Sequence, residues 1–187
     1  MDSAPLEPGT VVDLPEPATD GDLAVEGALA RRRSRREFSD GPLDRTAVAQ
    51  LLWATQGVTD EETGFRAAPS AGATFPLEVS LVVGADGVPD LEAGVYRYRP
   101  HAHELELVSL ADPRSALRAA ALDQSWIENA PVTVAISGVD ERTERQYGDR
   151  GSEQYVPMEA GHAGENLYLQ AEALDLATVA VGAFDDA

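Results

Sequence analysis

The chain of 187 residues contains no cysteine. This absence excludes disulfides, thiolate zinc sites, iron–sulfur ligands and cysteine nucleophiles, so any redox chemistry requires a separate cofactor. The chain also lacks a run of 18 or more apolar residues, and its first twenty residues contain no hydrophobic signal core. These absences predict a cytoplasmic protein with no membrane partner.

Lysine is absent as well, and all 14 basic residues are arginine, against 33 acidic residues and a formal net charge of -19. The acidic residues are spread along the chain, which is typical of a halophilic, salt-adapted surface. At about 1 M salt the Debye length is only about 3 Å, so only direct contacts would hold an anion. Nucleic acid is disfavoured as a partner because the domain has no basic face.

Length and an apolar content of 43% are enough for one domain with a sizeable core. Residues 1–20 carry four prolines among acidic residues, which predicts an extended or disordered arm. Residues 21–187 are then expected to form the single domain.

Hydrophobic periodicity predicts a mixed α+β domain. Helices are expected at 23–33, capped by Asp22, at 45–56, capped by Asp44, at 113–122 and at 157–174. Strands are expected at 77–84, 131–137 and 178–181, with a hairpin formed by 94–99 and 104–109. Residues 57–64 are expected to form an acidic loop and 141–155 a connection. The apolar face of 157–174 suits a core or a subunit interface equally.

Five arginines in six residues, at 31–33 and 35–36, surround Ser34 and reverse the local sign of the charge. Guanidinium groups hold phosphate through short bidentate contacts, so the cluster indicates an anion site. The alternative is that these cations only stabilise the C-terminus of the preceding helix.

Metal and hydrolase sites are not predicted. Glu159 and His162 share a helix face, but a di-iron site needs a second such pair and further carboxylates. His101 and His103 lie in a hairpin turn where no third ligand is evident. Ser70 lacks the Gly-x-Ser-x-Gly pattern of a nucleophile elbow.

Three segments together resemble the FMN-dependent nitroreductase superfamily, and within it the SagB-type dehydrogenases associated with ring-modified peptides. They are RRSRREF at 32–38, APSAGATFPLEV at 68–79 and the helix and turn at 159–184. The resemblance covers about 23–186 and implies cofactor contacts from each segment. The implied cofactor-binding residues are Arg32, Arg33, Ser34 and Arg36, then Pro69, Ser70, Ala71, Gly72 and Ala73, and finally Val181, Gly182 and Ala183.

The resemblance implies an α+β nitroreductase-like fold, in which helices flank a central, mostly antiparallel sheet and one long helix forms an interface. It further implies a homodimer that binds FMN and passes hydride through flavin N5 to or from a small organic or peptide-derived substrate. A backbone amide of Gly182 or Ala183 would hydrogen-bond N5. NAD(P)H would be a transient reductant, because the Gly-x-Gly-x-x-Gly fingerprint is absent.

Two departures from the resemblance keep alternatives open. In azoline-oxidising relatives a Lys-Tyr pair is proposed to remove a proton, and the matching residues here are Gln146 and Tyr147. Tyr147 is therefore the catalytic candidate, and its alternative role is a core or interface aromatic. Relatives also continue past the final turn, so the domain 21–187 is expected to lack their C-terminal extension. The alternatives are a non-catalytic flavin-binding or scaffold subunit of a peptide-modifying complex, and an acidic structural protein without a cofactor.

Overall fold

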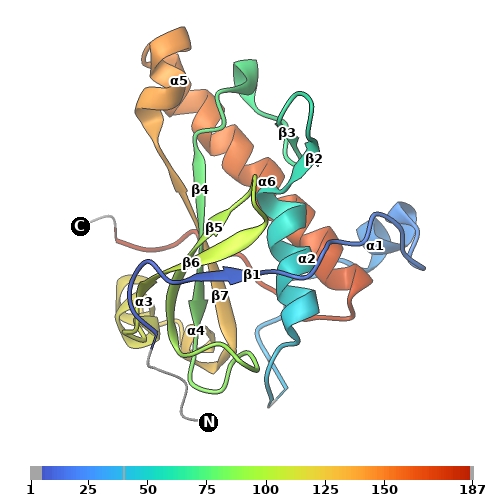
Figure 1. Cartoon of the computed structure of the whole chain (residues 1–187), viewed down its shortest axis with the longest axis vertical. Coiled ribbons are helices and arrows are strands. Elements are labelled where there is room, and N and C mark those ends of the chain that lie inside the picture. The colour runs from blue at the N-terminus through green and yellow to red at the C-terminus, as the bar shows by residue number, and fades with distance from the viewer. Residues whose placement is uncertain (1–5, 40, 186–187) are drawn as a thin grey trace.

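A five-stranded antiparallel sheet forms the centre of the molecule (Figure 1), as seen in a computed structural model that describes residues 6–39 and 41–185. The strand order is β1-β6-β5-β4-β7. The strands are β1 (Val11–Asp13), β4 (Leu77–Val83), β5 (Gly94–Arg99), β6 (Glu104–Ser109) and β7 (Val132–Gly138). The predicted hairpin of β5 and β6 is confirmed, and the expected strands at 77–84 and 131–137 match β4 and β7 within one residue.

Side-chain alternation explains the sheet. Along β5, Tyr96 and Tyr98 are fully buried while Arg97 and Arg99 between and after them face solvent, which is the period of two of a strand with one face in the core. Tyr98 pairs with Leu105 across the hairpin. The strand β4, which lies between β5 and β7 in the sheet, is buried over most of its length.

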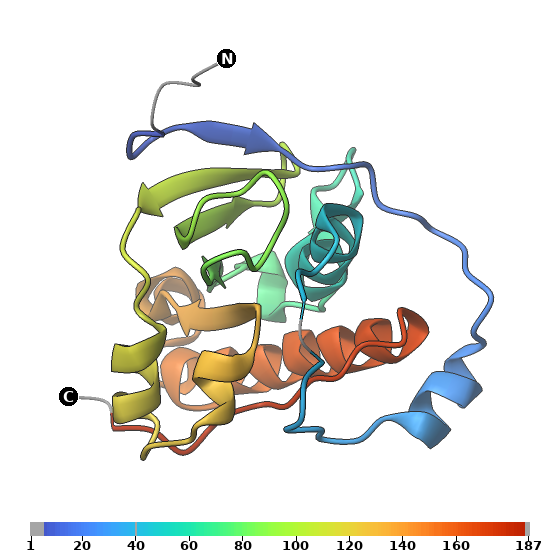
Figure 2. The same ribbon diagram turned by 90° about the horizontal axis from the view of Figure 1, so that it is seen from below.

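Two helices pack together beside the sheet, α2 (Arg45–Gln56) and α6 (Val156–Ala173) (Figure 2). The cap predicted for α2 is confirmed, since the Asp44 carboxylate accepts a hydrogen bond from Thr46 N at 2.6 Å. The inward face of α2 includes the buried Val48 and Leu52. The helix α6 contacts α2, β4 and β7, so its inward face forms part of the core.

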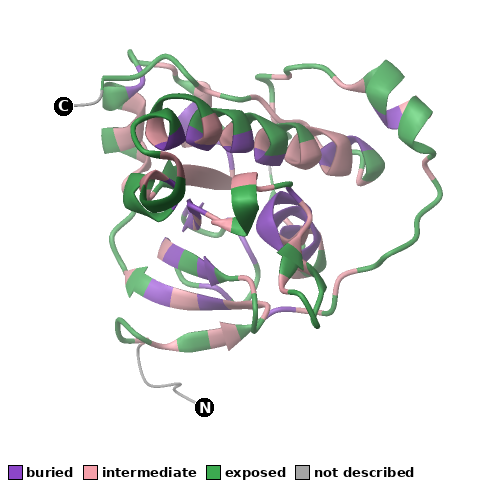
Figure 3. Ribbon diagram, turned by 90° about the horizontal axis from the view of Figure 1, so that it is seen from above, coloured by how far each residue is buried: buried purple, intermediate pink, exposed green. Residues whose placement is uncertain are grey.

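The first helix, α1 (Val25–Arg31), differs from its prediction. Its N-cap is Ala24, which makes no side-chain hydrogen bond, so the predicted cap at Asp22 is wrong. Only Ala28 of this helix is buried. Figure 3 shows α1 as a largely exposed helix set apart from the sheet, and its contacts are with α6.

Several short elements were not predicted. The expected connection at 141–155 contains α5 (Asp140–Tyr147) and a π-helical turn η2 (Gly151–Tyr155), and the expected loop at 57–64 contains β2 (Val58–Asp60), which pairs with β3 (Phe65–Arg66). The remaining elements are η1 (Ala71–Ala73), α3 (Arg114–Ala120), near the helix expected at 113–122, and α4 (Trp126–Asn129). The strand predicted at 178–181 is wrong: these residues are extended but belong to no sheet.

Part of the predicted N-terminal arm joins the sheet, since β1 pairs with β6. His103 holds the chain that follows β1: its Nε2–H donates to Pro15 O at 2.9 Å, and its Nδ1 accepts from the Tyr98 hydroxyl at 2.8 Å. Residues 1–5 of the arm lie outside the described range. Within that range no helix has the length and apolar content needed to cross a bilayer.

Candidate functional site

Two of the five clustered arginines contact one buried carboxylate at the end of α6. Arg35 forms an ion pair with Glu172, and Arg31 Nε lies 3.7 Å from the same carboxylate. Arg31 also reaches Asp175 Oδ1 at 2.7 Å. The hydrogen bond from Arg35 lowers the pKa of Glu172 below its usual range. Arg31 and Arg35 therefore tie α1 and the segment after it to α6.

The other three arginines keep donors available. The Arg36 guanidinium lies 5.1 Å from the Trp126 ring centre, and that of Arg32 lies 5.2 Å from the ring centre of Tyr168. Arg32 also lies 3.8 Å from Glu165, a long and exposed contact. Arg33 donates to its neighbouring backbone carbonyls at 3.0 and 2.7 Å. Within the described ranges neither Arg33 nor Arg36 forms an ion pair, so the anion capacity of the cluster resides mainly in these three side chains.

The arginine segment and the C-terminal segment lie side by side. After α6 the chain turns and runs back along the helix towards α3 (Figure 2), where Asp185 N donates to Ala120 O at 2.9 Å. On the way, Arg35 N donates to Thr178 O at 2.9 Å. Tyr168 of α6 joins the two segments: its hydroxyl lies 2.9 Å from Ser34 Oγ and accepts from Ala180 N at 2.7 Å.

Val181, Gly182 and Ala183 follow directly on this contact. Ala183 O accepts from Gln124 Nε2 at 3.1 Å, which holds the segment close to α4. Nothing lies within 4 Å of the position that a Cβ on Gly182 would occupy. The structure thus brings two of the three predicted cofactor segments together, with an open, thin backbone wall beside the arginines.

The remaining predicted segment, at 68–79, contains a strained loop at 69–75. Its backbone is left-handed at Gly72 (φ 58°), Ala73 (φ 53°) and Phe75 (φ 44°), a conformation that costs most non-glycine residues about 1–2 kcal/mol. Ser70 Oγ accepts from Phe75 N at 2.9 Å and so closes the loop. Pro69, Gly72 and Ala73 are exposed. Strain of this kind collects at functional sites, where surrounding contacts maintain it.

A buried polar cluster contacts the loop at 69–75 and supports it. Glu159 of α6 is 2% exposed, and Gln56 Nε2 donates to it at 3.4 Å while Gln56 Oε1 accepts from Arg66 at 3.1 Å. Burial raises the pKa of Glu159, and hydrogen bonds from Ser70 and Gln56 oppose the rise. Burial also lowers the pKa of Arg66. The cluster links α2, α6 and the loop, so it fixes where the loop begins.

Tyr147, the predicted catalytic residue, lies against the same loop. A Cβ added to Gly72 would lie 2.5 Å from the Tyr147 hydroxyl and 2.7 Å from the Gln146 amide, so any larger residue would have to displace these two side-chain ends. Gln146 Nε2 donates to the Tyr147 hydroxyl at 3.2 Å, and Tyr155 packs edge-on to the Tyr147 ring with the ring centres 4.9 Å apart. The predicted catalytic residue and the predicted loop therefore lie together.

The two halves of the predicted site do not meet within one chain. The loop rests on Glu159 and the arginine segment on Glu172, and these positions are about 20 Å apart along α6 at 1.5 Å per residue. Tyr168, which joins two of the predicted segments, was not predicted as a site residue. In the sequence Tyr168 is one position of an apolar helix face. Only its hydrogen bonds to Ser34 and Ala180 show that it joins the two segments.

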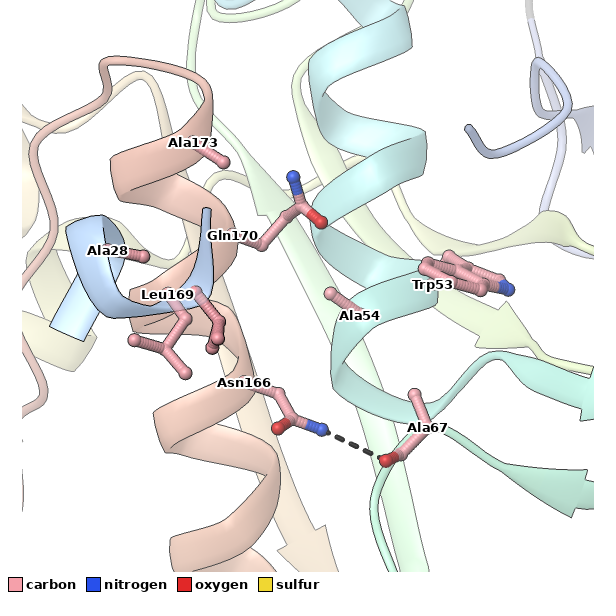
Figure 4. Close-up of a pocket in the computed structure, with 9 residues that line it drawn as sticks. Ala28, Trp53, Ala54, Ala67, Asn166, Leu169, Gln170 and Ala173 are labelled. Atoms are coloured by element: carbon pink, nitrogen blue, oxygen red, sulfur yellow. Dashed lines mark hydrogen bonds between the residues drawn. The ribbon is translucent and has the colours of Figure 1, made fainter. Parts of the chain in front are cut away.

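A groove of about 270 Å³ lies between α1, α2 and α6 (Figure 4). Asn166, whose side-chain amide donates to Ala67 O at 3.1 Å, and Gln170 are the polar residues of its lining. The lining is otherwise apolar: Val25, Ala28, Trp53, Ala54, Ala67, Leu169 and Ala173. It contains no predicted cofactor residue and no cation, so it does not suit a phosphate-bearing ligand.

Glu159 and His162 belong to no group of three or more potential metal ligands within the described ranges. His162 is exposed, whereas Glu159 points into the cluster below the loop.

The Nitroreductase family profile matches residues 29–187 of the chain. The chain belongs to the nitroreductase family. A relative from Methanocaldococcus jannaschii, provisionally named nitroreductase MJ1384, is 44% identical over 165 residues, covering 88% of this chain and 81% of the relative. The trifolitoxin operon protein TfxC of Rhizobium leguminosarum bv. trifolii is 29% identical over 153 residues, 74% of this chain but only 42% of TfxC.

Solved structures show that this nitroreductase-family chain has the family fold. A crystal structure of a provisionally named nitroreductase from Ralstonia eutropha JMP134 superposes with a TM-score of 0.75 at 29% identity, covering 92% of this chain and 79% of that one. The fold also matches the Escherichia coli microcin synthetase McbBCD complex with truncated pro-MccB17 bound (TM-score 0.64, 21% identity, 93% and 65% coverage). A third match is a Desulfovibrio desulfuricans protein in complex with FMN (TM-score 0.55, 21% identity, 84% and 67% coverage). The predicted α+β fold, with its antiparallel sheet and long helix, is confirmed.

Proposed function

We propose that this nitroreductase-family oxidoreductase uses FMN and works as a homodimer in which two copies complete each site. The observation that carries the proposal is the separation of the site halves at opposite ends of α6. A two-fold axis across α6 would set the arginine end of one copy beside the loop end of the other, because a symmetric interface repeats each contact twice.

The exposed side of α6 supports such an interface. Gly161 and Gly164 face open space, with nothing within 4 Å of a Cβ placed on either, and Met158 is 56% exposed. Small residues allow two helices to approach closely, while the opposite side of α6 packs on α2 and the sheet. The helix thus has one face for the core and one for a second copy.

The donor set suits FMN. Arg32, Arg33, Arg36 and the Ser34 hydroxyl offer donors of the kind that phosphate accepts, and the backbone at Val181, Gly182 and Ala183 is thin enough to lie along a planar ring. The structural neighbour from D. desulfuricans carries FMN, which supports the same cofactor here. When bound, FMN supplies hydride transfer through N5, and the chain supplies binding and orientation.

Substrate chemistry takes place beside the loop in this proposal. The Tyr147 phenol, held over Gly72 by Gln146 and Tyr155, is the proton-transfer group of the site. A SagB-type activity on a peptide-derived substrate is the finer proposal, supported by the likeness to TfxC and to the microcin synthetase complex. NAD(P)H is the proposed transient reductant.

The visible absorption spectrum of the purified protein tests the proposal, recorded in high salt with and without FMN and then with anaerobic NAD(P)H. We expect a bound flavin band that bleaches, and a dimer in sedimentation analysis. Protein that takes up no FMN would refute the cofactor assignment.

A scaffold subunit is the second candidate, favoured by the Gln146 amide where azoline-oxidising relatives have lysine. An amide cannot take up a proton at neutral pH, so the site would bind flavin without acting on a substrate. Bound flavin that neither NAD(P)H nor substrate reduces would support the scaffold. Turnover that falls roughly 10²–10⁴-fold in Tyr147→Phe, with FMN still bound, would support the enzyme.

A further inference from the structure

Among the described residues, the Tyr168 hydroxyl is the one side-chain group that hydrogen-bonds both to the arginine segment, at Ser34, and to the segment before Val181, at Ala180. It lies 2.9 Å from Ser34 Oγ and 2.7 Å from Ala180 N. We infer that Tyr168 is a positioning residue for phosphate recognition: it fixes Ser34 as a donor to the anion and couples that donor to the Val181–Ala183 segment. The inference rests on the proposed FMN function.

The available protons fix the direction of the bond with Ala180, and the proposal assigns the direction of the contact with Ser34. A backbone N–H can only donate, so the Tyr168 oxygen accepts from Ala180. Tyr168 keeps its own hydrogen, and Ser34 Oγ lies within reach of it. The proposal assigns Tyr168 as the donor of this contact, so that Ser34 accepts and keeps its own hydrogen for another partner.

A phosphate group is a partner that needs this hydrogen. Its oxygens accept hydrogen bonds, so a serine hydroxyl beside it contributes only as a donor. If Ser34 instead donated to Tyr168, the serine would present lone pairs to the anion. The contact from Tyr168 thus determines whether Ser34 attracts or repels phosphate.

The Tyr168 ring is held firmly enough for this role. The Arg32 guanidinium lies 5.2 Å from the ring centre. Arg35 N donates to Thr178 O at 2.9 Å, which pairs the two segments two residues before Ala180. Ser34 and the Val181–Ala183 segment are therefore held in one hydrogen-bonded unit, and a ligand that fixes one also fixes the other.

The test compares FMN with riboflavin, which lacks the phosphate. In Tyr168→Phe we expect the Kd for FMN to rise roughly tenfold, as for a lost hydrogen bond to a charged group, and the Kd for riboflavin to change less than about twofold. Both constants come from quenching of flavin fluorescence. Equal losses for the two flavins, or no loss for FMN, would overturn the inference.

A double-mutant cycle with Ser34→Ala separates positioning from simple packing. Adding Tyr168→Phe to Ser34→Ala should cost no further FMN affinity, whereas a packing role would lower affinity in either background. Tyr96→Phe is the matched control, because it removes a hydroxyl that donates to Glu92 O at 2.8 Å on strand β5. It should leave the preference for FMN over riboflavin unchanged.

Two further outcomes are decisive. If Tyr168→Phe does not fold, Ser34→Ala and Ser34→Thr test the same contact: alanine should reduce affinity for FMN alone, and threonine should retain it. A similar loss for both flavins in Ser34→Ala would overturn the inference while leaving FMN binding intact. Wild-type protein that binds neither flavin would overturn the proposed function itself, and this inference with it.

Discussion

At the scale of single residues, the arginine cluster divides into two kinds of side chain. Arg31 and Arg35 share the buried carboxylate of Glu172, while Arg33 and Arg36 make no ion pair within the described ranges. The charge reversal in the sequence marks the cluster but does not separate these roles, because the partners lie some 140 residues further along the chain. The sequence shows a basic site, and only tertiary contacts show which cations remain available.

This division predicts that two arginine variants affect different quantities, one the binding of FMN and the other the stability of the fold. Arg36→Ala should weaken FMN binding by roughly 1–3 kcal/mol and riboflavin binding far less, since it removes a proposed charged donor to the phosphate. Arg31→Ala is the matched control from the same cluster, and should lower the free energy of unfolding while keeping the FMN preference. Fluorescence titration and chemical denaturation measure the two quantities. Equal FMN losses in both variants would contradict the division.

Glu172 predicts a defined pH dependence of stability. Its pKa is lowered in the folded chain by the hydrogen bond from Arg35, so its stabilisation is present above its ordinary value of 4.5 and is lost as pH falls through the lowered value. Glu172→Gln should therefore flatten the acid side of the stability profile. At neutral pH it should cost about 1–3 kcal/mol, the usual range for hydrogen bonds to charged groups.

Thermal melts recorded from neutral pH to well below the ordinary glutamate pKa of 4.5 check the prediction. Glu165→Gln is the control, because that side chain is 48% exposed and lies 3.8 Å from Arg32. An exposed pair of this kind contributes little, so the control should follow the wild-type profile. A control that also loses its acid dependence would mean that general charge, and not the Glu172 contact, sets the profile.

At the scale of elements, sequence patterns succeed where burial follows a regular period. The helix α2 and the β5–β6 hairpin match their predicted bounds because their buried positions recur at helical and strand spacing. The helix α5 was missed because only Thr143 in it is buried, so its sequence has no apolar stripe to recognise. Residues 178–181 have strand-like composition, yet their hydrogen bonds go to Arg35 and Tyr168 instead of a neighbouring strand.

The loop at 69–75 predicts a conspicuous cost for Gly72→Ala. The substitution forces alanine into a left-handed backbone and displaces the Tyr147 hydroxyl and the Gln146 amide. Gly64→Ala is the control, since Gly64 also has a positive φ, of 71°, and a Cβ there would meet only His101 Cε1 at 3.5 Å, an ordinary van der Waals contact. The control isolates the backbone cost of about 1–2 kcal/mol. Chemical denaturation should show a larger loss of unfolding free energy for Gly72→Ala than for the control. Equal losses would mean that the Tyr147 side chain moves aside with no measurable cost in stability.

At the scale of the whole molecule, the order of segments along the chain and their order in space differ. The family resemblance predicts three cofactor segments, but nothing in their sequence tells which of them a single chain brings together. The structure pairs the first with the end of the third, while the second rests on Glu159, about 20 Å along α6 from Glu172 at 1.5 Å per residue. Two incomplete half-sites per chain are the expected consequence of a site shared between copies.

Sharing of this kind predicts complementation between two defective variants. Arg36→Ala damages the arginine half of each site, and Gly72→Trp blocks the loop half beside Tyr147. A homodimer of either variant has two damaged sites. A mixed dimer places both defects in one site and leaves the other intact, because each site takes one half from each copy.

Unfolding and refolding an equal mixture should therefore restore flavin binding at about one flavin per four chains, the value for random pairing of two-fold dimers. Equilibrium dialysis measures this stoichiometry at a free FMN concentration that fills wild-type sites but leaves each variant refolded alone, the control, nearly empty. If both halves of a site came from one chain, each mixed dimer would still hold one defect in each site and the mixture would bind no more than the controls. Binding of about one flavin per four chains thus distinguishes a site shared between two copies across α6 from a site built within a single copy.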